Sequence, residues 1–262
     1  MCEKCGCGEK ASGDQEHLHE HEHDHVHPHE HDRTHGDDSV HEGHRTTPRK
    51  ITLEQRVLAR NDEIAEENRA WLTARKVVAL NLISAPGTGK TLLLERTLER
   101  LQGRIRCAII TGDQRTDNDA CRLQGKGAIV RQIETHSACH LDAQMIKIVL
   151  PEVITDGVKL LFIENVGNLV CPAVYDLGES FKVALMSTTE GEDKPIKYPV
   201  LFMQAPVVVL TKIDLAPYLD WNIKLCREYL QRVHPGVFVF ELSAKTGQGL
   251  DTWIEYLEKL LA

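Results

Sequence analysis

The spacing of apolar residues predicts helices and strands that alternate from residue 51 onward. In 51–75 apolar side chains recur at helical spacing, which predicts an amphipathic helix with a break near Asn61. Short apolar runs predict five buried strands, at 77–83, 106–111, 159–164, 207–211 and 237–242. Helical patterns predict further helices at 91–101, 141–154, 219–233 and 250–261. Because the strands are apolar on both faces, we expect an α/β fold whose mainly parallel sheet carries helices on both faces.

The first fifty residues show neither pattern. Apart from Met1, their only large apolar residues are Leu18, Val26 and Val40. They carry 6 basic and 12 acidic side chains, a net charge of −6. Such a segment cannot bury enough apolar surface to offset the chain entropy lost on folding. We therefore expect two parts: a disordered tail over 1–50, and a folded domain over 51–262 that is long enough for one core.

The composition of the whole chain excludes several classes of protein. Its formal charge of −8 disfavours general binding to nucleic acid, because phosphate contacts need clustered Lys and Arg. No run of 18 apolar residues could span a membrane, and no apolar core of a secretory signal stands near the start. We expect a cytoplasmic protein whose 8 cysteines are thiols or metal ligands rather than disulfides.

A phosphate-binding loop follows the first predicted strand. The stretch 84–91 reads SAPGTGKT, which is the P-loop pattern with Ser84 in place of its first glycine. Backbone amides and the start of the next helix would surround the phosphates. Lys90 would reach the β- and γ-phosphates, and the hydroxyl of Thr91 would bind Mg²⁺. The predicted fold is therefore a P-loop NTPase, with phosphate contacts from Gly87, Thr88, Gly89, Lys90 and Thr91.

Two further strand ends are typical of GTPases and would read the base. The first is the Thr-Lys-Ile-Asp run of Thr211, Lys212 and Asp214. An Asp carboxylate accepts from both the ring N–H and the amine of guanine, whereas adenine offers an acceptor and no amine there. The stem of Lys212 would pack on the base. The second run, Ser243, Ala244 and Lys245, would contact the guanine carbonyl through the Ala244 amide.

Two acidic residues are candidates for Mg²⁺ and catalysis. Glu164 ends the apolar run LLFIE, which resembles a Walker B strand. Asp113 follows the strand predicted at 106–111 and could bind Mg²⁺ or position the attacking water. Gly167 could approach the γ-phosphate, which would make 164–180 a nucleotide-sensing switch. Together with Lys90, Asp113 and Glu164 are the predicted catalytic residues.

The tail contains two groups of metal-ligating side chains. Cys2, Cys5 and Cys7 stand among glycines and could form a soft four-ligand site with one nitrogen, for Ni²⁺ or Zn²⁺. Eleven of the 14 histidines lie between His17 and His44. Imidazole suits nickel, zinc and copper, so we expect a nickel store. Its eight alternating members are His17, His19, His21, His23, His25, His27, His29 and His31.

A third group lies in the predicted domain and contains Cys139, His140 and Cys171. Adjacent residues project in different directions from regular structure, so we expect that one chain does not close a full site. Since Cys171 follows Glu164 and Gly167 closely, metal there would be coupled to the bound nucleotide. The remaining domain cysteines, Cys107, Cys121 and Cys226, fit core-like patterns, so we expect them to be packing residues.

These motifs together resemble the HypB family of hydrogenase maturation GTPases. The resemblance rests on MCEKCGCG at 1–8, the His-rich linker, SAPGTGKT at 84–91 and ENVGNLVCPA at 164–173. It implies a SIMIBI-class GTPase with slow turnover that delivers Ni²⁺ to the large subunit of [NiFe]-hydrogenase, with the HypA metallochaperone as partner and a GTP-linked homodimer. It also implies a nickel site at Cys2, Cys5 and Cys7, and a nickel or zinc site at Cys139, His140 and Cys171 on the dimer interface.

Two alternatives remain at this stage. A urease accessory GTPase, UreG, shares the class, but the tail cysteines and the adjacent Cys139-His140 pair argue against it, since UreG has Cys-Pro-His there. A nickel or zinc buffer would use the tail and linker alone. The phosphate and guanine motifs argue against that interpretation for the whole chain.

Overall fold

The computed structural model describes residues 52–113, 118–136 and 138–262. The predictions for the tail lie outside these residues, including those for the cysteines of 1–8 and the histidines of 17–31. None of the helices in the described residues is long and apolar enough to cross a membrane.

A single parallel sheet organises the described residues. Its strands are β1 (Val78–Ser84), β2 (Arg106–Asp113), β3 (Ala128–Glu134), β4 (Val158–Glu164), β5 (Phe181–Ser187), β6 (Val207–Thr211) and β7 (Phe238–Glu241). They lie in the order β3-β2-β4-β1-β5-β6-β7, and every pairing is parallel. All carboxyl ends therefore meet at one edge, where α/β proteins bind ligands.

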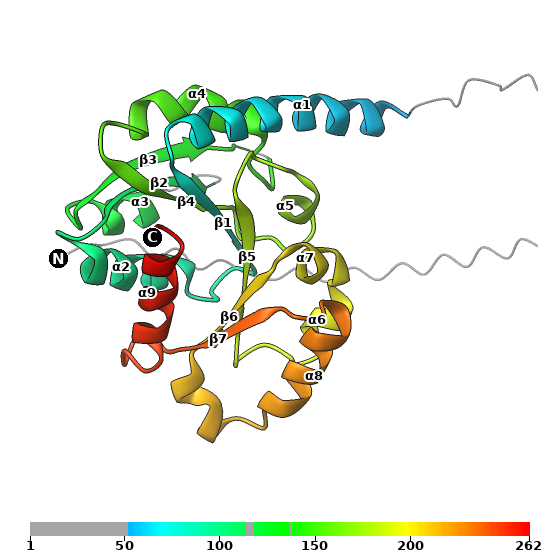
Figure 1. The fold of residues 1–262 in the computed structure, drawn as a ribbon. Helices are drawn as coiled ribbons and strands as arrows, with labels where there is room; N and C mark the ends of the chain where they lie inside the picture. The colour runs from blue at the N-terminus through cyan, green and yellow to red at the C-terminus, as the bar shows by residue number, and fades with distance from the viewer. Residues whose placement is uncertain (1–51, 114–117, 137) are drawn as a thin grey trace, which may run out of the picture. The chain divides into compact units, whose positions relative to one another are not determined.

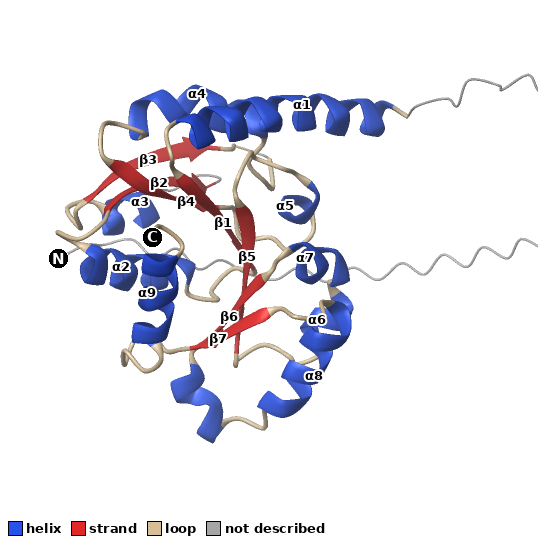
Figure 2. Cartoon of the chain, in the orientation of Figure 1, coloured by secondary structure: helices blue, strands red, loops and turns tan. Residues whose placement is uncertain are grey.

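Helices cover both faces of this sheet, as predicted (Figures 1 and 2). The α-helices are α1 (Leu53–Ala74), α2 (Lys90–Leu101), α3 (Asn118–Leu123), α4 (Ala143–Val153), α5 (Cys171–Val174), α6 (Lys194–Lys197), α7 (Pro199–Gln204), α8 (Ile223–Val233) and α9 (Leu250–Lys259). Leu80 and Leu82 pack with α2 and α9, whereas Ala79 and Ile83 face the opposite core with α1, α4, α7 and α8. Alternate strand residues thus serve two cores, which confirms the prediction of buried strands.

Two strands were not predicted. β3 is only half-buried and carries charged Arg131 and Glu134, so its apolar pattern is weak. β5 contains Lys182 inside an otherwise apolar run. That lysine is buried, and its amine donates to the carbonyl of Ala173 and to Gln204 Oε1 at 2.5 and 2.7 Å. Hydrogen bonds thus make a charged residue acceptable in a buried strand.

The break expected near Asn61 is wrong, because α1 runs continuously from Leu53 to Ala74. A capping box starts the helix, with reciprocal hydrogen bonds between Thr52 and Gln55. Asn61 is buried rather than helix-breaking: its amide donates to the carbonyl of Asp176 at 2.8 Å and accepts from the backbone N–H of Ala143 at 2.9 Å.

Two smaller expectations also need correction. The helix predicted at 219–233 begins only at Ile223, and a 3-10 helix, η1 (Ile213–Tyr218), precedes it. Cys107 and Cys226 are buried, as expected for packing residues, but Cys121 is exposed on α3. Burial raises the pKa of the Cys107 and Cys226 thiols to about 12, which makes both unreactive.

Candidate functional site

The phosphate loop connects β1 to α2 at the carboxyl edge of the sheet. Gly87 and Gly89 have φ values of +74° and +103°, a region that side chains rarely adopt, so the loop needs glycine there. The buried amine of Lys90 donates to Ser84 Oγ at 2.9 Å. Ser84, which replaces the usual first glycine, therefore holds the amine in place at the start of the loop.

A cavity of about 540 Å³ opens beside this loop. Its wall contains loop and helix residues, the ends of β2 and β4, and the segment 164–167; the loop and helix residues are Pro86, Gly87, Gly89, Lys90, Thr91 and Leu92. The three residues predicted to bind Mg²⁺, Thr91, Asp113 and Glu164, all line this wall. Asp119 and Arg122 of α3 line it too. The sequence analysis missed both, because no motif marks α3.

One corner of the cavity has the oxygen donors that Mg²⁺ prefers. Thr91 Oγ1 donates to Glu164 Oε1 at 2.7 Å. Glu164 Oε2 and Thr111 Oγ1 are buried without a hydrogen-bond partner among the described residues. Thr111 and Glu164 are direct neighbours in the register of β2 and β4. Buried oxygens without partners are costly, so these two fit a bound cation with its water shell.

Burial sets the charge state of this corner. It raises the pKa of Glu164 to about 7, although the charge of Lys90 and the hydrogen bond from Thr91 oppose that shift. Burial also lowers the pKa of Lys90, opposed by the charge of Glu164 and of nearby acidic groups. Each charge therefore compensates for the other in a poorly solvated site.

We expect Mg²⁺-dependent nucleotide binding to strengthen as the pH rises from about 6 to 8. The folded-state pKa of Glu164 is about 7, above the ordinary value of 4.5, so its carboxyl is largely protonated below that pH. A protonated carboxyl is a poor ligand for Mg²⁺ and must release its proton when the ion binds. Calorimetry in buffers of different ionisation enthalpy should show proton release on binding. The Glu164→Gln variant lacks this carboxyl, so its remaining pH dependence measures the titration of the nucleotide phosphates. An identical pH dependence in that variant would contradict the assignment.

The base-reading motifs lie beside the phosphate loop. Thr211 Oγ1 donates to the carbonyl of Thr88 at 2.7 Å, and Lys212 Nζ donates to the carbonyl of Gly87 at 2.8 Å. Asp214 lies in the first turn of η1, whose Ile213 N–H donates to the carbonyl of Leu242 at 3.4 Å. The two loops at the ends of β6 and β7 are thus connected to each other and to the phosphate loop.

The second base-reading motif is a tight turn. The buried hydroxyl of Ser243 accepts from the Thr246 N–H at 3.2 Å, and its backbone carbonyl accepts from Gly247 at 2.8 Å. These bonds fix the backbone at Ala244, whose amide is the predicted contact to the base. Lys245 is exposed.

Glu190 is a further residue at the phosphate loop that the sequence analysis missed. Its carboxylate accepts from Thr88 Oγ1 at 2.7 Å and pairs with Lys194. Its carbonyl accepts from Trp221 Nε1 at 2.9 Å. No motif marks it, and only the fold brings it to the loop.

The predicted domain metal ligands come together within one chain. One donor atom each from Cys139, His140 and Cys171 lies within 4.8 Å of the other two. The expectation that neighbouring residues would point apart is therefore not met for Cys139 and His140. The ring of His140 lies 3.9 Å from that of Tyr175, centroid to centroid. Three donors still leave one position of a four-coordinate site for another ligand.

Comparisons with known proteins show the family to which the fold belongs. The family described as "CobW/HypB/UreG, nucleotide-binding domain" matches residues 78–241. The hydrogenase maturation factor HypB of Escherichia coli K12 is 41% identical over an alignment that covers 98% of each chain. A crystal structure of HypB from Archaeoglobus fulgidus matches with a TM-score of 0.74 and 38% identity, covering 78% of this chain and 100% of that one. HypB from Helicobacter pylori, solved in complex with nickel, matches with a TM-score of 0.73 and 34% identity, covering 77% and 95%.

Proposed function

This chain belongs to the CobW/HypB/UreG family of nucleotide-binding proteins, and from that premise we propose that it is a GTP-hydrolysing nickel metallochaperone for [NiFe]-hydrogenase maturation. One observation carries the proposal. The segment from Glu164 to Cys171 begins at the hydrogen bond to Thr91 in the nucleotide cavity and ends at the Cys/His cluster. A phosphate site and a metal site thus share one short piece of chain.

The nucleotide chemistry is assigned to the cavity wall. Lys90 would neutralise the β- and γ-phosphates, while Thr91 and Glu164 would hold Mg²⁺ and Asp113 would position water or metal. Bound Mg²⁺ supplies charge neutralisation at the phosphates. These residues act by positioning and by electrostatic stabilisation, so slow intrinsic hydrolysis is expected.

Nickel is the proposed cargo. Cys139, His140 and Cys171 offer two thiols and an imidazole, a donor set that binds Ni²⁺ or Zn²⁺. The relative solved with nickel supports Ni²⁺. The three tail cysteines and the alternating histidines would add a second site and a store. The proposed partners are the HypA metallochaperone, the hydrogenase large subunit and a second copy of this chain in a GTP-linked dimer, in the cytoplasm.

The Asp214→Asn variant tests the choice of base. We expect it to weaken GTP binding by at least about 100-fold, because Asn keeps one acceptor, loses the negative charge and turns an N–H donor toward a donor of guanine. Xanthosine triphosphate should bind the variant better than the wild type, since its extra carbonyl can accept from the Asn amide. Asp220→Asn, a nearby exposed control, should bind GTP normally. Equal GTP and ATP affinities in the wild type would contradict the assignment.

Deletion of the gene tests the cellular role in a host that makes both a [NiFe]-hydrogenase and a urease. We expect loss of hydrogenase activity, partial recovery with added nickel, and unchanged urease activity. The converse pattern would identify a urease factor. An unchanged hydrogenase would refute the proposal.

A further inference from the structure

Two asparagine side chains connect the segment that follows Glu164 to the Cys139–His140 pair. Asn165 is buried and lies on the wall of the nucleotide cavity. Its Oδ1 accepts from the backbone N–H of Leu141, the residue after His140, at 3.2 Å. The same oxygen accepts from the N–H of Val166 at 3.0 Å. One side chain thus fixes both the cavity wall and the backbone next to a metal donor.

Asn168 makes a second contact, to the peptide group between Cys139 and His140. Its Nδ2 donates to the carbonyl of Cys139 at 3.4 Å. Its Oδ1 accepts from the N–H of Val170, the residue before Cys171, at 2.9 Å. One side-chain amide therefore connects the backbone at Cys139 to the backbone directly before Cys171. We call Asn165 and Asn168 together the asparagine clamp.

The nucleotide side of the clamp is in close contact with the phosphate loop. Glu164 is bonded to Thr91, and a Cβ added at Gly167 would lie only 3.0 to 3.2 Å from the ring and backbone of Pro86. Gly167 thus lies against Pro86, so a movement of the phosphate loop toward this contact would displace the segment that carries the clamp. The packed interior permits few intermediate positions.

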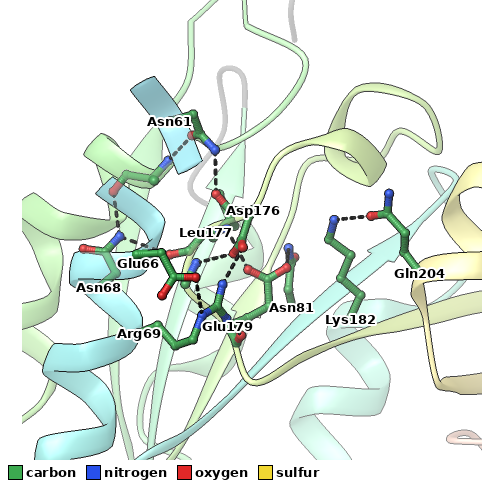
Figure 3. A network of polar contacts seen from close by, with 12 residues as sticks. Asn61, Glu66, Asn68, Arg69, Asn81, Asp176, Leu177, Glu179, Lys182 and Gln204 are labelled. Carbon is green, nitrogen blue, oxygen red and sulfur yellow. Dashed lines mark hydrogen bonds and ion pairs between the residues drawn. The ribbon is translucent and has the colours of Figure 1, made fainter. Parts of the chain in front are cut away.

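A buried polar network continues from Asn165, and Figure 3 shows its members Asn81, Glu179 and Lys182. Asn165 Nδ2 donates to Asn81 Oδ1 at 3.2 Å, and Asn81 in turn donates to buried Glu179 at 3.1 Å. Lys182, whose amine the charge of Glu179 stabilises, donates to the carbonyl of Ala173 in α5, the helix that begins at Cys171. The network therefore connects Asn165, through Asn81 and the charged pair of Glu179 and Lys182, to the helix that begins at Cys171.

We propose that Asn165 and Asn168 are positioning residues that transmit the state of the nucleotide cavity to the cluster of Cys139, His140 and Cys171. This rests on the proposed function, since it needs both a nucleotide and a nickel ion to bind. The clamp contacts the backbone between Cys139 and His140 through Asn168 and directly after His140 through Asn165. Movement of 164–168 therefore changes the separation of these donors from Cys171, and with it the nickel affinity.

The test is the ratio of nickel dissociation constants measured with GDP and with a non-hydrolysable GTP analogue. Ni²⁺ is titrated into the full chain, and each titration is repeated with Cys171→Ala added, so that the domain site is obtained by difference. In the wild type we expect a ratio of about 5-fold or more, in either direction. In Asn165→Ala and in Asn168→Ala it should fall to within about 2-fold of one, with nickel stoichiometry retained. Asn168 does not line the nucleotide cavity, so Asn168→Ala should also retain nucleotide binding, and Asn165→Ala is measured at nucleotide concentrations that saturate it.

Two further variants separate this role from loss of stability. Asn68→Ala removes another buried asparagine with two backbone hydrogen bonds, to the carbonyls of Ala143 and Leu177, and should keep the wild-type ratio. Asn165→Asp keeps an oxygen facing the Leu141 and Val166 amides but loses the N–H donor to Asn81 Oδ1, so it should restore only part of the ratio. If Asn165→Ala does not fold, half-buried Asn168 provides the decisive variant.

The outcomes are distinguishable. A wild-type ratio near one would refute coupling between the two sites, and with it this inference, but would leave GTP hydrolysis and nickel binding by the chain untouched. A wild-type ratio that survives in the clamp variants, or falls equally in Asn68→Ala, would overturn only the role of the clamp.

Discussion

Replacing Lys90 with alanine is expected to reduce GTP hydrolysis by at least about 100-fold. The amine is buried at the start of α2 and donates to Ser84, so its charge is already held at the phosphate loop before substrate binds. Its loss has a second effect. Lys90 is the largest influence that lowers the pKa of Glu164 against burial, so without it this pKa rises above about 7. The carboxyl that would bind Mg²⁺ is then protonated at neutral pH.

The measurement is steady-state phosphate release with saturating Mg²⁺ and GTP, accompanied by nucleotide titration. Lys197→Ala removes an exposed lysine of α6 and should leave the rate unchanged. Raising the pH should deprotonate Glu164 and restore part of the Mg²⁺ affinity in Lys90→Ala. It should not restore the hydrolysis rate, because the contact of the amine with the phosphates is still missing. A variant that hydrolyses GTP at the wild-type rate would remove Lys90 from the mechanism.

The elements that could be predicted from sequence are those whose pattern is local. β1, β4 and β6 are mainly apolar, with Asn81 the polar residue inside β1 and Lys159 near the start of β4, and the phosphate loop is contiguous between β1 and α2. β5 escaped prediction because Lys182 is compatible with burial only when Ala173 and Gln204 supply its partners, and both lie elsewhere in the chain.

The same distinction applies to the site. Lys90, Thr91 and Glu164 stand in recognisable motifs, and the cavity brings them together. Glu190 stands in no motif, and the run ENVGNLVCPA that contains the asparagine clamp does not show what the two side chains contact. Glu190 contacts Thr88, which is 102 residues away, and Asn165 contacts Leu141, which is 24 residues away. Their roles depend on which loops the strand order brings to one edge of the sheet.

The Cys171→Ala substitution is expected to weaken nickel binding at the domain site by at least about 100-fold, because even an outer-shell partner of a metal ligand is worth about 10- to 100-fold. Cys171 is the donor that completes the cluster from a second segment, since Cys139 and His140 are adjacent in the chain. Without it, two donors remain, which is too few to hold a divalent ion tightly.

Calorimetry and thiolate-to-metal absorption measure this loss, with the tail present in every sample. Cys121→Ala is the matched control, because it removes an exposed thiol of the same domain that lies outside the cluster. Both variants should bind GTP normally, since neither residue lines the nucleotide cavity. Loss of one bound nickel in Cys171→Ala, and none in Cys121→Ala, would place the ion at the end of the segment that begins at Glu164. Equal nickel binding by both variants and the wild type would mean that the described cluster holds no nickel, and the delivery role would then depend on the tail alone.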